Sequence, residues 1–144
     1  MDGLLQNRVL WASLVAWALA QVLKFVVVLV MDRRVDLTRL VGAGGMPSSH
    51  TAFVSALALA TGRVEGFHSP LFAVAFVFAS IVMYDATGVR QAVGKQAEVL
   101  NKIVDDLYHA AGIREERLRE LLGHTPVEVL AGAVLGITVA VFFT

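Results

Sequence analysis

The segment Gly44–Thr51, with the sequence GGMPSSHT, holds residue types that together can bind an oxyanion and move a proton. Its two glycines let the backbone approach a ligand closely, the proline suits the first turn of a helix, and the serines can cap the exposed amides there. A helix start of this kind attracts phosphate, and His50 lies one turn into it, where it can exchange a proton with a bound phosphoester. The alternative is a capped helix start whose histidine satisfies a neighbouring polar group, and the segment alone favours neither interpretation.

His124 and Glu128 form a second pair that can do chemistry. Residues four apart stack on one face of a helix, so the carboxylate can accept a proton from one imidazole nitrogen and leave the other nitrogen free to attack. The flanking glycine, threonine and proline are typical of a helix start, so a capping motif with an incidental pair is the alternative.

Lys24, Asp85 and Glu128 are ionisable residues in otherwise apolar segments. Each is a candidate for a functional site, because leaving a charge in hydrocarbon costs at least about 2.5 kcal/mol. Gln21 lies three residues before Lys24 and shares its helix face, which would turn both side chains into a helix bundle. Lys24 can instead extend toward the lipid headgroups.

The composition places these residues in a membrane protein. The chain has 144 residues, of which 57% are hydrophobic, and a mean hydropathy of +0.70, which is more apolar than a soluble domain of this length needs. The clearest spans are Val9–Met31, Pro70–Tyr84 with an extension to Val89, and Thr125–Phe143. The alanine-rich Ser48–Thr61 is short for a crossing and fits either a full span or a re-entrant helix.

These segments predict an all-α fold, a polytopic membrane helix bundle of about four transmembrane helices in a single domain over residues 1–144. An even number of crossings collects the basic residues on one side and leaves only Arg8 and Arg63 on the other. By the positive-inside rule the basic side is cytoplasmic, so we expect a multi-pass protein of the cell membrane with its site on the cytoplasmic side. Arginines that bind phosphate would gather on that side whatever the topology.

Gln91–Leu122 is the one extended polar region, and it predicts an amphipathic helix along the membrane face or over the bundle. Apolar residues recur three and four positions apart over Val93–Leu107, and Gly112 breaks the pattern. Asp105 and Asp106 could bind magnesium, but a solvated helix face is the favoured interpretation, so no metal site is predicted.

Other features of the composition exclude classes of function. The 12 basic residues balance the 12 acidic ones, and no basic stripe is interleaved with aromatic residues, which argues against nucleic acid as a partner. The chain has no cysteine, so no disulfide or thiolate site is available. A cleaved signal peptide ending near Ala20 is disfavoured because the apolar run continues to Val30.

Three segments together resemble the signature of the type 2 phosphatidic acid phosphatases and vanadium haloperoxidases, and more closely that of their divergent bacterial and plant branch. These segments are Gly44–His50, Asp85–Arg90 and Leu121–Glu128. They occur in the family's order, and the resemblance runs over nearly the whole chain.

The resemblance implies a phosphatase that uses a phosphohistidine intermediate and needs neither metal nor cofactor. Carried over to this chain, His124 is the nucleophile, Glu128 orients it and His50 is the general acid. The phosphoryl oxygens would be bound by cationic side chains and by the amides and hydroxyls of two serines. This set comprises Lys24, Arg39, Arg90, Ser48 and Ser49.

Two residue types depart from the parent pattern. Ser49 stands where the parent usually has glycine, and Glu128 stands where it usually has aspartate. Asp85 has no counterpart, and we assign it a supporting role in holding Arg90.

The spacing of two arginines also differs from the parent family's pattern. Arg90 is separated from the candidate nucleophile by the whole amphipathic segment, so Arg119 is an alternative. Arg39 lies farther from the lysine than in the parent, so Arg33 and Arg34 are alternatives.

The resemblance further implies a lipid phosphate substrate, because the site opens at the depth of the headgroups. A cytoplasmic site fits a phosphatidylglycerophosphate-like or phosphatidate-like phosphomonoester, and the inverted topology would favour an undecaprenyl diphosphate. Four spans are fewer than the parent's usual six, which favours a homodimer that completes the packing. A non-catalytic protein that binds anionic headgroups is the alternative from another class, and a haloperoxidase is disfavoured because the chain shows no peroxide or halide pocket.

Overall fold

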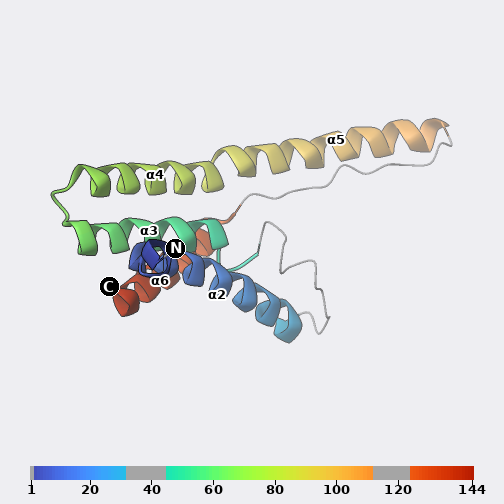
Figure 1. Cartoon of the computed structure of the whole chain (residues 1–144). Helices are drawn as coiled ribbons and strands as arrows, with labels where there is room; N and C mark the ends of the chain where they lie inside the picture. The colour runs from blue at the N-terminus through green and yellow to red at the C-terminus, as the bar shows by residue number, and fades with distance from the viewer. Residues whose placement is uncertain (1, 32–44, 112–123) are drawn as a thin grey trace.

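The computed structural model describes residues 2–31, 45–111 and 124–144, and within them the fold is all-helical (Figure 1). The helices are α1 (Asp2–Leu5), α2 (Arg8–Met31), α3 (Ser49–Glu65), α4 (Pro70–Thr87), α5 (Val89–Ala111) and α6 (Pro126–Phe143). The helical membrane bundle predicted from the sequence is confirmed.

Helix α3 is the centre of this bundle. It packs against α2, α4 and α6, and α2 also packs against α6. The start of α3 lies beside the start of α6, and Lys24, near the end of α2, reaches the same place. Helices α3 and α6 are therefore parallel, α2 is antiparallel to both, and their polar ends meet on one side of the bundle.

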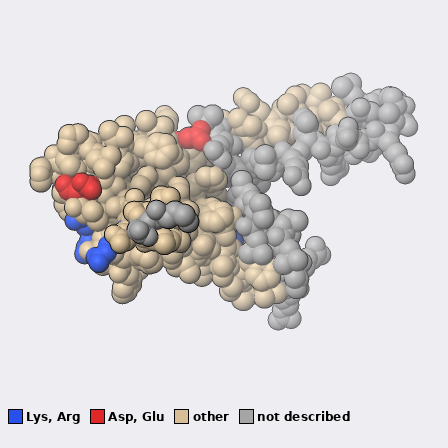
Figure 2. All heavy atoms as spheres, in the orientation of Figure 1, with Lys and Arg blue, Asp and Glu red and all other residues tan. Residues whose placement is uncertain are grey.

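Of the described helices, α2, α6 and the joined α4 and α5 are long and apolar enough to cross a membrane. Helix α3 has only 17 residues and is rich in alanine, serine, threonine and glycine. All four helices expected to cross are present, but α3 faces other helices instead of lipid. Small residues suit that position because they let helix backbones approach closely. On the face shown in Figure 2, the described charged side chains are few and lie near the ends of the bundle.

Small residues recur every four positions on the three helices whose polar ends meet. They are Ala12, Ala16 and Ala20 on α2, Ala52, Ala56 and Ala60 on α3, and Gly132, Gly136 and Ala140 on α6, and all of them are buried. A Cβ atom on Gly132 would collide with the carbonyl oxygen of Ser48, and one on Gly136 would collide with that of Ala52. Helices α3 and α6 therefore touch backbone to backbone, which only glycine permits at these two positions.

Helix α5 continues the line of α4 beyond the other helices and does not fold over the bundle (Figure 1). Only Gly88 separates the two helices, and hydrogen bonds continue through it, because its amide donates to the carbonyl of Tyr84 (2.9 Å) and its carbonyl accepts from the amide of Ala92 (3.0 Å). The predicted amphipathic helix is present. Of its two predicted placements, along the membrane face or over the bundle, the structure excludes the second, since the junction leaves no loop in which the chain could turn. The predicted break at Gly112 lies outside the described residues.

Candidate active site

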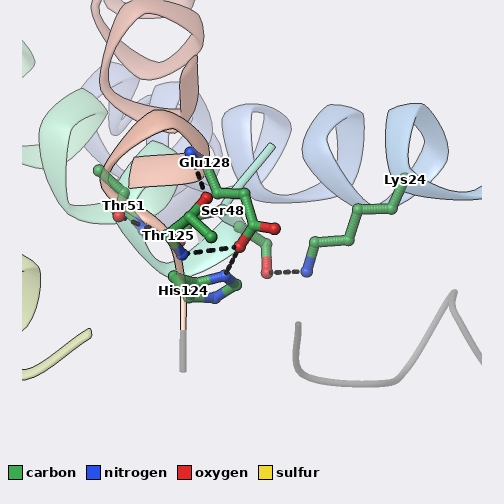
Figure 3. A network of polar contacts seen from close by, with 7 residues as sticks. Lys24, Ser48, Thr51, His124, Thr125 and Glu128 are labelled. Carbon is green, nitrogen blue, oxygen red and sulfur yellow. Dashed lines mark hydrogen bonds and ion pairs between the residues drawn. The ribbon is translucent and has the colours of Figure 1, made fainter. Parts of the chain in front are cut away.

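His124 and Glu128 meet at the start of α6 (Figure 3). The Nδ1 atom of His124 lies 2.9 Å from Oε2 of Glu128, and the histidine is only 4% exposed. An ionised carboxylate can only accept hydrogen bonds, so Nδ1 of His124 is the donor, and the neutral ring keeps its lone pair on Nε2. The pairing predicted from the four-residue spacing is therefore present.

The same carboxylate oxygen also takes part in the helix cap. Oε2 of Glu128 accepts from the amide of Thr125 (3.2 Å), and the Thr125 hydroxyl accepts from the amide of Glu128 (3.3 Å), which completes a capping box. The capping motif considered as an alternative is thus real, but it does not replace the histidine pair. Because the cap fixes the carboxylate, it also fixes the imidazole that the carboxylate holds.

Ser48 joins the start of α3 to the start of α6. Its hydroxyl caps α3 by accepting from the amide and the hydroxyl of Thr51, at 3.4 and 3.0 Å. Its own amide donates to the backbone carbonyl of Glu128, 3.0 Å away, and its carbonyl lies against Gly132. The histidines of the two helices are therefore held in a fixed relation by backbone contacts.

Lys24 enters the same region from α2 (Figure 3). It is 1% exposed, and its Nζ atom donates to the hydroxyl of Ser49 across 2.9 Å. The side chain thus turns into the bundle, as its shared face with Gln21 predicts, and does not extend toward the headgroups. A buried ammonium beside the amino terminus of α3 combines two sources of positive potential, which favours an anion at this point.

His50 faces His124 from the first turn of α3. Their ring centroids are 6.4 Å apart and the ring planes are inclined by 56°. His50 is exposed, whereas His124 is buried. At this separation one ring can attack a phosphorus atom while the other reaches its leaving oxygen.

The structure thus brings together Lys24, Ser48, Ser49, His50, His124 and Glu128. Asp85 is half-buried in the last turn of α4. The remaining predicted residues lie outside the described part of the chain or have side chains that it does not describe. They are Arg33, Arg34, Arg39, Arg90, Asp105, Asp106 and Arg119.

Thr51 and Gly132 are parts of the site that the sequence analysis did not single out. Thr51 follows the histidine of the first segment directly, and Gly132 lies one turn after Glu128. The repeat of Gly132 and Gly136 was a signal that α6 packs closely against another helix, although it does not name which one. In the described part of the chain, no three His, Asp or Glu residues gather in a way that could hold a metal ion.

Comparison with known proteins agrees with this combination of fold and site. A sequence model of the family described as "Divergent PAP2 family" matches residues 5–139, so the chain belongs to that family. The "Uncharacterized membrane protein YuiD" of Bacillus subtilis (strain 168) is 42% identical over an alignment of 145 positions that covers 93% of this chain and 92% of that protein. No solved structure matches the chain. The resemblance drawn from the three sequence segments is confirmed at the level of the family.

Proposed function

We propose that this membrane protein hydrolyses a lipid phosphomonoester through a phosphohistidine intermediate. The observation that carries the proposal is the pair of buried His124 and half-buried Glu128, which leaves Nε2 of His124 available. The ring of His50, on a second helix, has its centroid 6.4 Å from that of His124. A headgroup-binding protein would benefit from Lys24 and the start of α3, but it would not need a histidine held by a carboxylate.

In the first half-reaction, Nε2 of His124 attacks phosphorus. The N–P bond forms as the P–O ester bond breaks, and protonated His50 donates its proton to the departing lipid alcohol. Glu128 stabilises the positive charge that develops on the attacked ring and keeps the ring oriented.

In the second half-reaction, water attacks the phosphohistidine. His50, now neutral, takes a proton from this water as the N–P bond breaks, so inorganic phosphate leaves and both histidines regain their starting states. This cycle balances without a redox step and uses no cofactor or metal.

The phosphoryl oxygens are bound by Lys24 and the hydroxyl of Ser49, whose 2.9 Å contact supports this assignment. Arg39 and Arg90 complete the set, and Asp85 holds Arg90. Ser48 contributes by fixing the start of α3, since its amide already donates to Glu128.

The substrate is a phosphatidate-like or phosphatidylglycerophosphate-like lipid on the cytoplasmic side of the cell membrane, and a homodimer completes the packing of the short bundle. An undecaprenyl diphosphate would be the substrate if the site faced outward. The charge asymmetry of the loops supports the cytoplasmic choice.

The test is phosphate release by the purified protein from a panel of lipid phosphates, with His124→Ala as the inactive variant. His68→Ala is the matched control, because His68 is an exposed histidine in the connection between α3 and α4, at the opposite end of α3. We expect His124→Ala to lose turnover and the acid-labile phosphoprotein, and His68→Ala to keep both. Near wild-type turnover by His124→Ala would remove the nucleophile assignment, and headgroup binding without turnover in the wild type would favour the non-catalytic alternative.

A further inference from the structure

An apolar groove of about 260 Å³ lies between α3, α4 and α6. Helices α4 and α6 both pack on α3 but make few contacts with each other, so the groove separates them over the surface of α3. Small side chains form much of its lining, among them Ser55 and Ala58 on α3 and Ala133 on α6.

Aromatic rings line the end of the groove that is distant from the histidines. Phe67 and Phe72 stand edge to face with centroids 5.1 Å apart, and Phe76 follows 5.9 Å from Phe72. The rings of Phe67 and Phe72 pack on Gly62, where a Cβ atom would lie 2.6 Å from Phe67 and 2.9 Å from Phe72. The absence of a side chain at Gly62 therefore lets the aromatic rings lie directly on α3.

The other end of the groove is directed toward the candidate active site. On α3 the lining residues Leu59 and Ser55 continue at four-residue spacing to Thr51, which bonds to Ser48. On α4 the lining ends at Met83, one turn before Thr87 at the end of that helix. The groove thus points along the helices toward the level where His50 and His124 meet, and its lining ends about one turn before that level.

The length of the groove matches one leaflet of a membrane. On α4 the lining runs from Phe72 to Met83, which are 11 positions apart, or about 17 Å at the rise of an α-helix. The acyl chains of one leaflet fill about 15 Å, half of a hydrocarbon core of about 30 Å. A chain that enters the groove beside Met83 would therefore reach the aromatic residues near its methyl end.

We propose that this groove binds one acyl chain of a glycerophospholipid whose phosphate lies between His50 and His124. The proposal rests on the proposed function, and it extends that function by naming a second part of the substrate, the acyl chain, that the protein recognises. A polyprenyl chain is much longer than the stretch lined from Phe72 to Met83, so the geometry favours a diacyl lipid phosphate over an undecaprenyl one.

The kinetic test compares Ala133→Phe, which fills the groove, with Val134→Phe, which adds a similar bulk at the exposed neighbouring position. With long-chain phosphatidate, Ala133→Phe should lower kcat/KM about tenfold or more, the usual effect of a misfit in an apolar pocket. Both variants should hydrolyse p-nitrophenyl phosphate within about twofold of wild type, since this substrate has no chain. Equal losses on both substrates, or no loss on phosphatidate, would overturn the groove assignment.

A binding test separates failure of the groove from failure of the proposed function. The probe is a phosphatidate with a photoactivatable diazirine near the end of one acyl chain, applied to wild-type protein in phosphatidylcholine vesicles. Crosslinks should map to groove residues such as Phe76 and Ile137 and should decrease in Ala133→Phe but not in Val134→Phe. Such crosslinks without any turnover would keep the groove and remove the phosphatase, whereas crosslinks confined to outward residues such as Val134 would remove the groove.

Discussion

Gly132→Ala is the most informative single change, because it adds one methyl group at the contact that links the two histidine-bearing helices. The new Cβ would meet the carbonyl oxygen of Ser48 well inside the ~3.5 Å separation that nonbonded atoms prefer. Helices α3 and α6 must then separate by about 1 Å, which costs about 1–3 kcal/mol of stability.

The consequence for activity should exceed the consequence for stability. The movement displaces Ser48 and His50 on α3 relative to His124 and Glu128 on α6, and it stretches the 3.0 Å hydrogen bond between Ser48 and Glu128. Misplacement of catalytic groups by about 1 Å costs about 100-fold in rate. We therefore expect kcat/KM for phosphatidate to fall about 100-fold while the protein still folds.

Gly136→Ala is the matched control. It adds the same methyl group against the same neighbouring helix, at the carbonyl of Ala52, but one turn farther from the histidines. Thermal unfolding in detergent should show similar losses of stability for the two variants, and phosphate release should show a much larger loss for Gly132→Ala. Equal loss of activity in both variants, or wild-type activity in Gly132→Ala, would refute the claim that this contact positions the site.

Three further predictions concern individual side chains. Glu128→Gln keeps a side chain that can form the capping box but weakens the hold on His124. We expect kcat to fall about 100-fold or more, a smaller loss than in His124→Ala, with little change in the unfolding temperature. Lys24→Met removes the buried ammonium beside Ser49 and should raise the inhibition constant of vanadate about tenfold or more, measured by competition with substrate, whereas an unchanged constant would place the anion elsewhere. His50→Asn should lower the turnover of phosphatidate about 100-fold but that of p-nitrophenyl phosphate much less, because the phenolate departs without needing a proton. Equal slowing of both substrates would make His50 a phosphate ligand instead of the general acid.

The sequence was sufficient wherever an interaction joins residues within one helical turn. Runs of apolar residues predicted α2, α4 and α6 closely, because a span of hydrocarbon requires such a run whatever surrounds it. The His124–Glu128 pair depends on the geometry of a single helix start, so its spacing predicted it. The caps at Ser48 and Thr125 are equally local, and the sequence offered them as a cap by one of two serines and as an alternative to the pair.

The tertiary structure decided every relation between helices. The bond from Lys24 to Ser49 joins residues 25 positions apart, and the bond from Ser48 to Glu128 joins different helices, so neither follows from local spacing. Both bonds depend on how closely the helix backbones pack. The small residues at every fourth position allow this close packing, but a stripe of alanine or glycine does not determine which helix is the partner. The central place of α3 and the apolar groove depend on that same packing, and for this reason they emerged only once the helices were assembled. The direction of α5 depends instead on the hydrogen bonds that continue from α4 through Gly88.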